Sequence, residues 1–331
     1  NSPQTTTISS LLSCTRASTG TYINASGVMQ TFSSNTLRYG TNGLLVEEAR
    51  TNLILQSNAL SNASWLKSNV NSTTQDGTLG PDGTTQLWSL SPSSGLQIHE
   101  WYQQVTVTSG TTHSLSAIVK PGGKSYVQLM SQVSVNQYVA AVFDLTSAAN
   151  TSASQTSVGA SATLVSTSQK ALSNGCFLIT LVCSITGANP FFVINPAPAA
   201  TGNTFNSGGD ISWNAATTDT IYAGFCQLET GSFATSYIPT TSSSATRAAD
   251  VVTMSASNLP VSTTLGSIYA QLNFMSVAGG SSTGVVSASE PNGRLLYATS
   301  AKVFSYDGTT ACSSPNLFSD NTTAKAATAN S

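Results

Sequence analysis

The sequence predicts an all-β protein. Charged residues make up only 7% of the 331 residues, and the polarity is carried by Ser, Thr, Asn and Gln, which suit strands and turns better than helix interiors. Hydrophobic residues at 40% are enough to build a core, and aromatic and β-branched residues are spread along the chain, which argues against disorder. Short β-rich runs separated by turn signals recur from Leu53 to about Pro239. Together these observations indicate a β-sandwich or barrel.

Composition and charge argue against two classes of function. The net charge is −2, and the sequence has no basic patch that could neutralise a phosphate backbone, so nucleic-acid binding is not expected. The most apolar run, Cys176 to Cys183, has the length of a strand and falls far short of the ~20 residues that a membrane-spanning helix needs. We therefore expect no membrane insertion.

The cysteines and histidines indicate neither a disulfide framework nor a metal site. The chain has five cysteines, an odd and small number for its length. Cys176 and Cys183 are seven residues apart, so they face opposite sides of a straight strand and lie too far apart to bond. No Cys-x-x-Cys or His-x-x-x-His spacing occurs. We expect buried or free thiols, no metal and no cofactor; a structural calcium ion is not indicated.

Residues 1–52 are expected to form an extended N-terminal segment that serves in attachment. The segment is polar and broken into short pieces by glycines. Its last part, "LLVEEARTNLIL" from Leu44 to Leu55, is ambiguous, because the Glu-Glu-Ala-Arg centre favours helix while the flanks favour strand. Twelve residues do not decide between the two.

Residues 53–240 are expected to form one two-sheet antiparallel sandwich with almost no helix. The runs "WYQQVTVT", "THSLSAIVK", "SYVQLMSQVSV", "QYVAAVFDL", "CFLITLVCSI" and "TIYAGFCQLE" are typical strands, and Asp-Gly, Pro-Gly-Gly and Asn-Gly turns separate many of them. Alternation is clearest at two places, where the residues predicted to face the core are Val105 and Val107, and then Leu115, Ala117 and Val119. Thr106, Ser116 and Ile118 are predicted to lie on the other face.

The stretch "CQLETGSFATSYIPTTSSSATRAAD", Cys226 to Asp250, indicates a domain junction. Its first residues end a strand, Pro239 cannot donate to a β-ladder, and the Ser/Thr run that follows cannot form a core. A second β-rich pattern begins at Val251, so residues 241–331 are expected to form a second β domain. Arg247 and Asp250 either tie the junction down beside this domain or are two solvated charges on a loop.

Several segments resemble virion proteins of tailed bacteriophages. The junction stretch resembles a segment of these proteins in which a Gln-Leu-Glu strand precedes Thr-Ser-Tyr-Ile-Pro-Thr and Thr-Arg-x-x-Asp. The segments "ASTGTYINASGVMQT" and "GLLVEEARTNLILQSNALSNASW" resemble the pieces that precede it there. "VTVTSGTTHSLSAIVKPGGKSYVQL" and "AVFDLTSA" are similar to a carbohydrate-binding-module-like jelly roll of phage tail fibres and head fibres. "GSIYAQLNF", "GVVSASEPNGRLLY" and "SYDGTTA" resemble the first half of a concanavalin-A-like domain.

The resemblance implies a non-catalytic protein on the surface of the virion: a fibre, spike or capsid decoration protein with a jelly roll followed by a second β-sandwich. Its implied partners are other virion proteins, further copies of itself in a cyclic homo-oligomer, most often a trimer, and host cell-surface glycans. About 80 residues follow Asp250, fewer than a lectin-like sandwich needs, so the second domain is either small or incomplete in this sequence.

One departure from the resemblance concerns a turn. Similar proteins often carry a Trp-Tyr pair and then Arg after an Asn-Gly turn. In this chain, Asn174-Gly175 is followed by Cys176, Phe177 and Leu178. A sugar contact made by that Trp or Arg in relatives would be lost in this chain.

Catalytic patterns are weak. Gly280 to Gly284 matches Gly-x-Ser-x-Gly, but it lies in a Gly/Ser stretch between strands and no His follows it. His99 and His113 lie in or beside strands, where a satisfied structural histidine is the more common case. Paired carboxylates would be needed for glycoside hydrolysis, and no spacing brings together the four acids considered, Asp144, Asp210, Asp219 and Glu229. We expect no enzymatic activity.

Sugar recognition is the more credible chemistry, because flat aromatic rings stack on sugar faces while amides and hydroxyls bond to sugar hydroxyls. Trp101 shares a face with Val105 and Val107 and is expected in the core. The aromatics considered for glycan contact are Trp213, placed first because a loop-like stretch holds it, then Tyr102, Trp88 and Tyr126. For each of them, core packing or a fibre interface is the competing interpretation.

Two alternatives to a virion appendage stay open at this point. The chain could supply the accessory carbohydrate-binding domains of a secreted glycan-active enzyme whose catalytic part lies elsewhere. It could also be a tailspike depolymerase, which would require paired carboxylates that the sequence pattern does not indicate.

Overall fold

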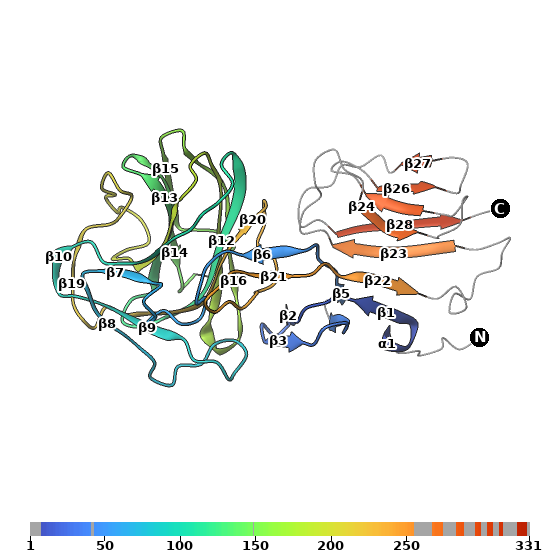
Figure 1. Cartoon of the computed structure of the whole chain (residues 1–331), viewed down its shortest axis with the longest axis horizontal. Helices are drawn as coiled ribbons and strands as arrows, with labels where there is room; N and C mark the ends of the chain where they lie inside the picture. The colour runs from blue at the N-terminus through green and yellow to red at the C-terminus, as the bar shows by residue number, and fades with distance from the viewer. Residues whose placement is uncertain are drawn as a thin grey trace. The chain divides into compact units, whose positions relative to one another are not determined.

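A computed structural model gives the fold of the chain (Figure 1). It describes residues 8–40, 43–147 and 149–254, together with six strands between residues 267 and 329. Two compact units are present, Asn1–Thr253 and Met254–Ser331. Helical structure in the described part is confined to α1 (Ile8–Leu11) and the 3-10 turn η1 (Ser173–Gly175), so the predicted all-β class is confirmed. No helix in the described part is long and apolar enough to cross a membrane.

The first unit is built around a β-sandwich of two six-stranded antiparallel sheets. The strands of sheet A, in spatial order, are β15 (Ser154–Val158), β14 (Gln137–Asp144), β13 (Tyr126–Ser134), β18 (Phe191–Pro196), β11 (Glu100–Gln104) and β7 (Leu66–Ser68). Those of sheet B are β16 (Ala162–Ala171), β17 (Phe177–Ile185), β12 (Thr111–Pro121), β20 (Ile221–Thr230), β9 (Trp88–Pro92) and β8 (Val70–Thr74). The chain crosses repeatedly between the sheets, and the orders β9-β20-β12-β17 and β11-β18-β13-β14 are those of a jelly roll.

The main core lies between the two sheets and follows the predicted alternation. Leu115, Ala117 and Val119 of β12 are fully buried in it, and Val105 and Val107 join them. Trp101 is also fully buried there, as the sequence predicted. The period of two along each strand therefore located the inner face correctly.

The other face of sheet B is buried as well. Ile118, on the opposite side of β12 from Leu115, is only 1% exposed. It belongs to a second cluster that contains Met29 from the N-terminal segment and Cys176 and Phe225 from sheet B or its flanks. The N-terminal segment thus adds a layer to the sandwich, which the alternation alone did not predict.

The cysteines behave as expected where side chains are described. Cys14, Cys176, Cys183 and Cys226 are free thiols. Cys176 lies in the second cluster and Cys183 in the main core, so they face opposite sides of sheet B.

The N-terminal segment is extended and pairs with the junction (Figure 1). It contributes β1 (Leu12–Thr15), β2 (Gly20–Ile23), β3 (Met29–Phe32), β4 (Arg38–Gly40), β5 (Gly43–Leu45) and β6 (Arg50–Asn52). The junction contributes β21 (Ala245–Arg247) and β22 (Val251–Met254), and the pairs are β1 with β22 and β6 with β21. The ambiguous stretch from Leu44 to Leu55 is therefore strand and loop, without helix. Because of these pairings the first unit extends to Thr253, beyond residue 241.

A cluster of five buried charged side chains joins the N-terminal segment to the junction. Arg16 Nη1 lies 2.7 Å from Asp250 Oδ1, and Arg38 bonds both to Asp250 and, at 2.7 Å, to Glu47 Oε2. Arg247 Nη1 lies 3.1 Å from the same Glu47 oxygen. All three guanidinium groups are at most 1% exposed. We call Arg16, Arg38, Glu47, Arg247 and Asp250 the arginine–carboxylate cluster.

Backbone and hydroxyl groups form further hydrogen bonds with the charged groups of the cluster. Arg16 also donates to the carbonyls of Ser18, Ser33 and Thr36, and Glu47 accepts from the amide and hydroxyl of Ser236. Burial alone would raise the pKa of Asp250, but hydrogen bonds from Arg16, the Glu47 amide and Arg38 outweigh burial and hold that pKa below its usual value. The interpretation of Arg247 and Asp250 as solvated charges is therefore wrong; they fix the junction to the N-terminal segment.

The described strands of the second unit form two antiparallel sheets. One pairs β23 (Ser267–Asn273) with β28 (Thr323–Ala329), and the other has the order β24 (Thr283–Ser287), β25 (Leu295–Ala298), β26 (Val303–Tyr306) and β27 (Ala311–Ser313). The β-rich pattern predicted after Asp250 is thus present. The start of the Gly-x-Ser-x-Gly match, residues 280–282, lies outside the described residues.

Replacing Asp250 tests the cluster. Asp250→Asn removes the charge that two buried guanidinium groups share, and we expect it to lower the free energy of unfolding by about 3–5 kcal/mol. Glu48→Gln is the matched control: Glu48 pairs with Arg50 but is 60% exposed, so its loss should cost less than about 1 kcal/mol. Guanidinium denaturation of both variants gives the comparison. Equal costs would show that the cluster contributes no more than a surface ion pair.

The same cluster predicts an acid dependence. Because the folded-state pKa of Asp250 lies below its usual value, its stabilisation is complete above about pH 4 and is lost as the pH falls through the lower folded value. In the Asp250→Asn variant, the free energy of unfolding should not show this loss as the pH falls.

Candidate functional site

The four aromatics considered for glycan contact lie at different places. Tyr102 of β11 and Tyr126 of β13 are half-buried on the outer side of sheet A. Trp88 of β9 is half-buried against the main core, and its Nε1 donates to the carbonyl of Asn58 at 2.8 Å. Trp213 is buried. The structure does not bring the four together at one open surface.

The position predicted for Trp213 is wrong. The stretch around it folds back as β19 (Trp213–Ala215), which pairs with β10 (Gly95–Gln97). The ring is 8% exposed, meets the His99 ring edge-on at 5.5 Å, and has Lys124 Nζ 5.3 Å from its centre. A Gly- and Asn-rich stretch was interpreted as a free loop, but its apolar side chains pack inward.

Residues 197–220, here called the covering segment, lie over the outer face of sheet A. Ile211, Trp213 and Ala215 pack against Val142 of β14. Gln128 Nε2 donates to the carbonyl of Gly209 at 2.6 Å. The outer face of sheet A, which carries Tyr102 and Tyr126, is therefore occupied by the chain itself.

Gly209 shows how closely the covering segment approaches the sheet. Its φ of +94° is a conformation that side chains rarely adopt, and a Cβ there would lie 2.5 Å from Met130 Sδ and from the ring of Tyr138. Only glycine fits at this point.

Asp210 of the covering segment is 4% exposed, and the pKa values of Asp210 and of Glu100, at the start of β11, depend on each other. Burial, then the hydrogen bond to Asp210 and its charge, raise the pKa of Glu100 to about 8. Burial raises the pKa of Asp210 as well.

The other acids considered for catalysis do not converge. Asp144 caps its own turn by accepting from Thr146, Asp219 lies 3.6 Å from Lys124 Nζ, and Glu229 accepts from Thr235. Glu100, whose pKa depends on Asp210, is an acid that the sequence pattern does not single out. The available signal was that Glu100 shares a strand face with Tyr102, opposite the core residue Trp101.

The two histidines have structural settings. His113 is fully buried, and burial lowers its pKa while a bond to the Thr111 carbonyl opposes this. His99 Nδ1 lies 3.0 Å from the carbonyl of Asn69. In the described part of the chain, no group of three or more His, Cys, Asp or Glu side chains is placed to hold a metal ion.

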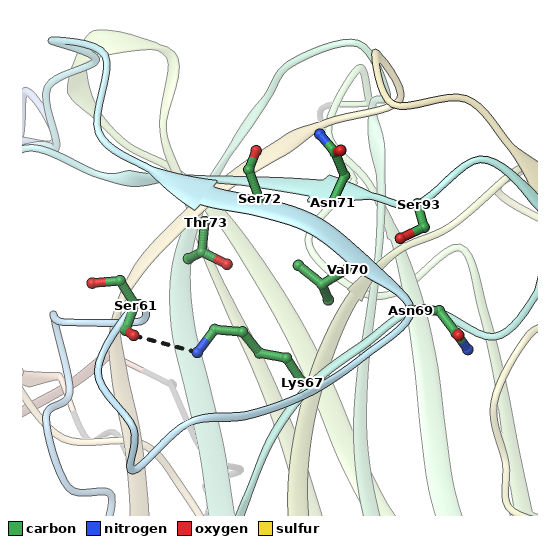
Figure 2. A pocket seen from close by; sticks show the side chains of 8 residues that line it. All are labelled: Ser61, Lys67, Asn69, Val70, Asn71, Ser72, Thr73 and Ser93. Atoms are coloured by element: carbon green, nitrogen blue, oxygen red, sulfur yellow. Dashed lines mark hydrogen bonds between the residues drawn. The ribbon is translucent and has the colours of Figure 1, made fainter.

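A polar groove lies where β7 and β8 meet at the edge of the sandwich (Figure 2). Its volume is about 490 Å³. The lining residues are Ser61, Lys67, Asn69, Val70, Asn71, Ser72, Thr73 and Ser93. Seven of these eight carry a hydroxyl, amide or ammonium group, and we call the hollow the hydroxyl–amide groove.

Several side-chain hydroxyls in the groove are uncommitted, meaning that they have no hydrogen-bond partner among the described residues. Among the described residues, the side-chain hydroxyls of Ser61, Ser72 and Ser93 have no hydrogen-bond partner in the protein. Lys67 Nζ donates to the Trp65 carbonyl at 2.8 Å and points toward Ser61 (Figure 2), and partial burial lowers the pKa of its ammonium group. The groove thus offers free hydroxyls and one cation to a ligand and no carboxylate.

A second hollow, of about 450 Å³, lies between β6, β21 and the end of β20. Charged side chains in its wall already bond to other protein groups. Arg50 in its wall bonds to Glu48 and lies 5.0 Å from the centre of the Phe233 ring. It therefore presents fewer free groups than the hydroxyl–amide groove.

Comparisons with known proteins do not assign the chain to a family. No protein-family profile matches it, and no curated protein matches it.

The buried position of Trp213 generates a prediction. Trp213→Ala should lower the free energy of unfolding by about 3–5 kcal/mol, as large-to-small changes of buried aromatics do. Leu96→Ala, on the neighbouring strand β10 but 76% exposed, should change it by less than about 0.5 kcal/mol. Thermal and denaturant unfolding distinguish the two. Unchanged stability of the Trp213 variant would mean that the ring does not help to hold the covering segment.

Proposed function

We propose that this chain is a non-catalytic structural part of a tailed-phage virion appendage, a fibre, spike or decoration protein on the particle surface. In this proposal it joins other virion proteins, assembles as a homotrimer, and contributes to adhesion to host surface glycans. The hydroxyl–amide groove is the adhesion site, and its uncommitted hydroxyls are the observation that carries this part of the proposal.

The chemistry of the groove suits a sugar. A saccharide offers many hydroxyls that both donate and accept, and the seryl hydroxyls of the groove can do both in return. Because the aromatics Trp88 and Trp213 are engaged in the sandwich, polar contacts would supply most of the recognition.

The architecture of the first unit supports the role of an appendage module. The strand pairs β1 with β22 and β6 with β21 place the incoming and outgoing chain side by side (Figure 1). A module whose two ends are locked together by strands and by the arginine–carboxylate cluster can transmit its position to a following domain. The resemblance of the N-terminal and junction segments to phage proteins concerns these same residues.

Two alternatives are weaker. Accessory domains of a secreted glycan-active enzyme would use the same groove, but the phage-like junction favours an appendage. A tailspike depolymerase needs two carboxyl groups about 5–9.5 Å apart, with the substrate between them. Asp144, Asp219 and Glu229 are instead each engaged with neighbouring groups, and Asp210 is only 4% exposed.

Glycan adhesion is tested on a panel of immobilised bacterial capsular and lipopolysaccharide glycans. We expect the wild-type chain to bind at least one of them. The triple variant Ser61→Ala, Ser72→Ala and Ser93→Ala should bind at least ~10-fold more weakly, a loss of about 1.4 kcal/mol. Its melting temperature should not change, because these hydroxyls have no protein partner.

The matched control removes exposed hydroxyls elsewhere. Thr163→Ala with Ser168→Ala alters exposed positions of β16 and should leave glycan binding intact. Equal binding by the triple variant and the control would exclude the groove as the site. Failure of the wild-type chain to bind any surface glycan would contradict adhesion itself.

Assembly is tested separately by light scattering of the full 331-residue chain. A mass three times the 34.0 kDa of the chain is expected. A monomer at micromolar concentration would contradict the trimer. Immunogold labelling of intact virions with an antibody against this chain tests whether it lies on the particle surface.

A further inference from the structure

The hydroxyl–amide groove contains a lysine that has no acidic partner. Lys67 of β7 lines the groove, and none of the eight lining residues is an Asp or a Glu. Within the described part of the chain, no carboxylate forms an ion pair with Lys67. Lys120 and Lys170 lack an ion pair there as well, but they line neither of the two hollows. Lys67 is therefore an unpaired cation that a ligand in the groove would meet.

The strand register directs Lys67 into the groove and a neighbouring acid away from it. In the ladder between β7 and β11, Lys67 lies opposite Trp101, whereas Glu100 lies opposite Ser68. Because successive side chains of a strand alternate, Lys67 shares the inner side with Trp101, and Glu100 points to the outer face. The strands β7 and β8 are the edge strands of their sheets, so Lys67 lies at the open edge between them. Figure 2 shows its side chain extending toward Ser61.

The ammonium group of Lys67 is only partly engaged. Its Nζ donates to the Trp65 carbonyl at 2.8 Å, whereas the carbonyl oxygens of Ser61 and Asn62 lie 3.5 Å away. An ammonium has three N–H donors, and contacts of 3.5 Å are at the long limit of a hydrogen bond. A ligand oxygen can therefore replace the long contacts. Partial burial lowers the pKa of Lys67 without an opposing carboxylate, and a bound anion would supply the missing countercharge.

Neutral donors surround this cation. The hydroxyls of Ser61, Ser72 and Ser93 have no hydrogen-bond partner among the described residues. Thr73 Oγ1 accepts from Trp101 Nε1 at 2.8 Å, so its own O–H stays available to donate. Hydrogen bonds in which one partner is ionised are roughly twice as strong as neutral ones. An anionic group beside Lys67 would gain more from these donors than a neutral hydroxyl would.

We propose that the hydroxyl–amide groove selects acidic glycans: Lys67 binds the carboxylate or phosphodiester group of a charged sugar, and the seryl hydroxyls bind the hydroxyls of that sugar. This inference rests on the proposed glycan adhesion and adds a requirement for charge. One ammonium balances one negative charge, which both of these groups carry. A neutral glycan would leave Lys67 without a countercharge and therefore binds more weakly.

Matched glycans test the charge requirement on the full wild-type chain. Polyuronates and polysialate are compared with their carboxyl-reduced forms, in which each carboxylate has become a CH₂OH group. Phosphodiester-linked glycans, dextran and mannan complete the panel. We expect carboxyl reduction to weaken binding at least ~10-fold, a loss of about 1.4 kcal/mol. Binding confined to the phosphodiester-linked glycans would identify phosphate as the anion. Raising the salt from about 0.05 M to about 0.5 M should weaken binding of the acidic glycan only.

Substitutions of Lys67 test the residue itself. Lys67→Met should reduce binding of the acidic glycan at least ~10-fold and leave binding of its carboxyl-reduced form unchanged. Lys67→Arg keeps the charge and should keep the preference. Lys170→Met is the matched control, because Lys170 is an exposed lysine of β16. If Lys67→Met lowers the melting temperature through loss of the bond to Trp65, Ser61→Asp serves in its place: it sets a carboxylate beside the ammonium and should abolish the preference.

The outcomes separate this inference from the adhesion on which it rests. Equal binding of acidic and neutral glycans, with binding still weakened in the triple serine variant, would leave the groove as a site for neutral sugars and overturn the charge requirement. A preference for acidic glycans that survives in Lys67→Met and in Ser61→Asp would place the anion elsewhere and overturn the role of Lys67. Absence of binding to every glycan would instead contradict the adhesion itself.

Discussion

The arginine–carboxylate cluster is the interaction on which the arrangement of the first unit depends. Arg16 follows β1 and Arg38 opens β4, whereas Asp250 comes from the junction, 234 residues after Arg16. Their bonds close the N-terminal segment onto the end of the jelly roll and fix the strands that place Met29 over Ile118. The cluster brings charges out of water at a cost, and guanidinium–carboxylate geometry with many further hydrogen bonds offsets that cost. In a chain with 7% charged residues, this is where charge is concentrated inside the fold.

The two faces of the sandwich are covered by different parts of the chain, and this decides what remains available for binding. The N-terminal segment covers the outer face of sheet B, while the covering segment covers that of sheet A. Both outer faces are therefore partly covered. Uncovered polar side chains lie at the edge of the sandwich, where β7 and β8 form the hydroxyl–amide groove. A binding role for this protein therefore rests on an edge groove.

Much of the fold could be predicted from the sequence, because strand alternation has a strict period of two and turn residues mark the ends of strands. Leu115, Trp101 and Val107 were placed correctly for this reason. Contacts between distant residues carry no such period: the spacing of Arg247 and Asp250 indicated a junction, but nothing local pointed to Arg16 as a partner. Trp213 is misplaced from the sequence because turn-forming residues around it hide its inward-facing neighbours.

We infer that the N-terminal segment and the jelly roll form one cooperative unit held by the arginine–carboxylate cluster. Native-state hydrogen exchange in increasing guanidinium chloride tests it directly. We expect amides of β2 and β4 to exchange through the same global opening as those of β12 and β20, with the same free energy and the same dependence on denaturant. Exchange of β2 and β4 through a separate opening of much lower free energy, while β12 and β20 stay protected, would contradict it.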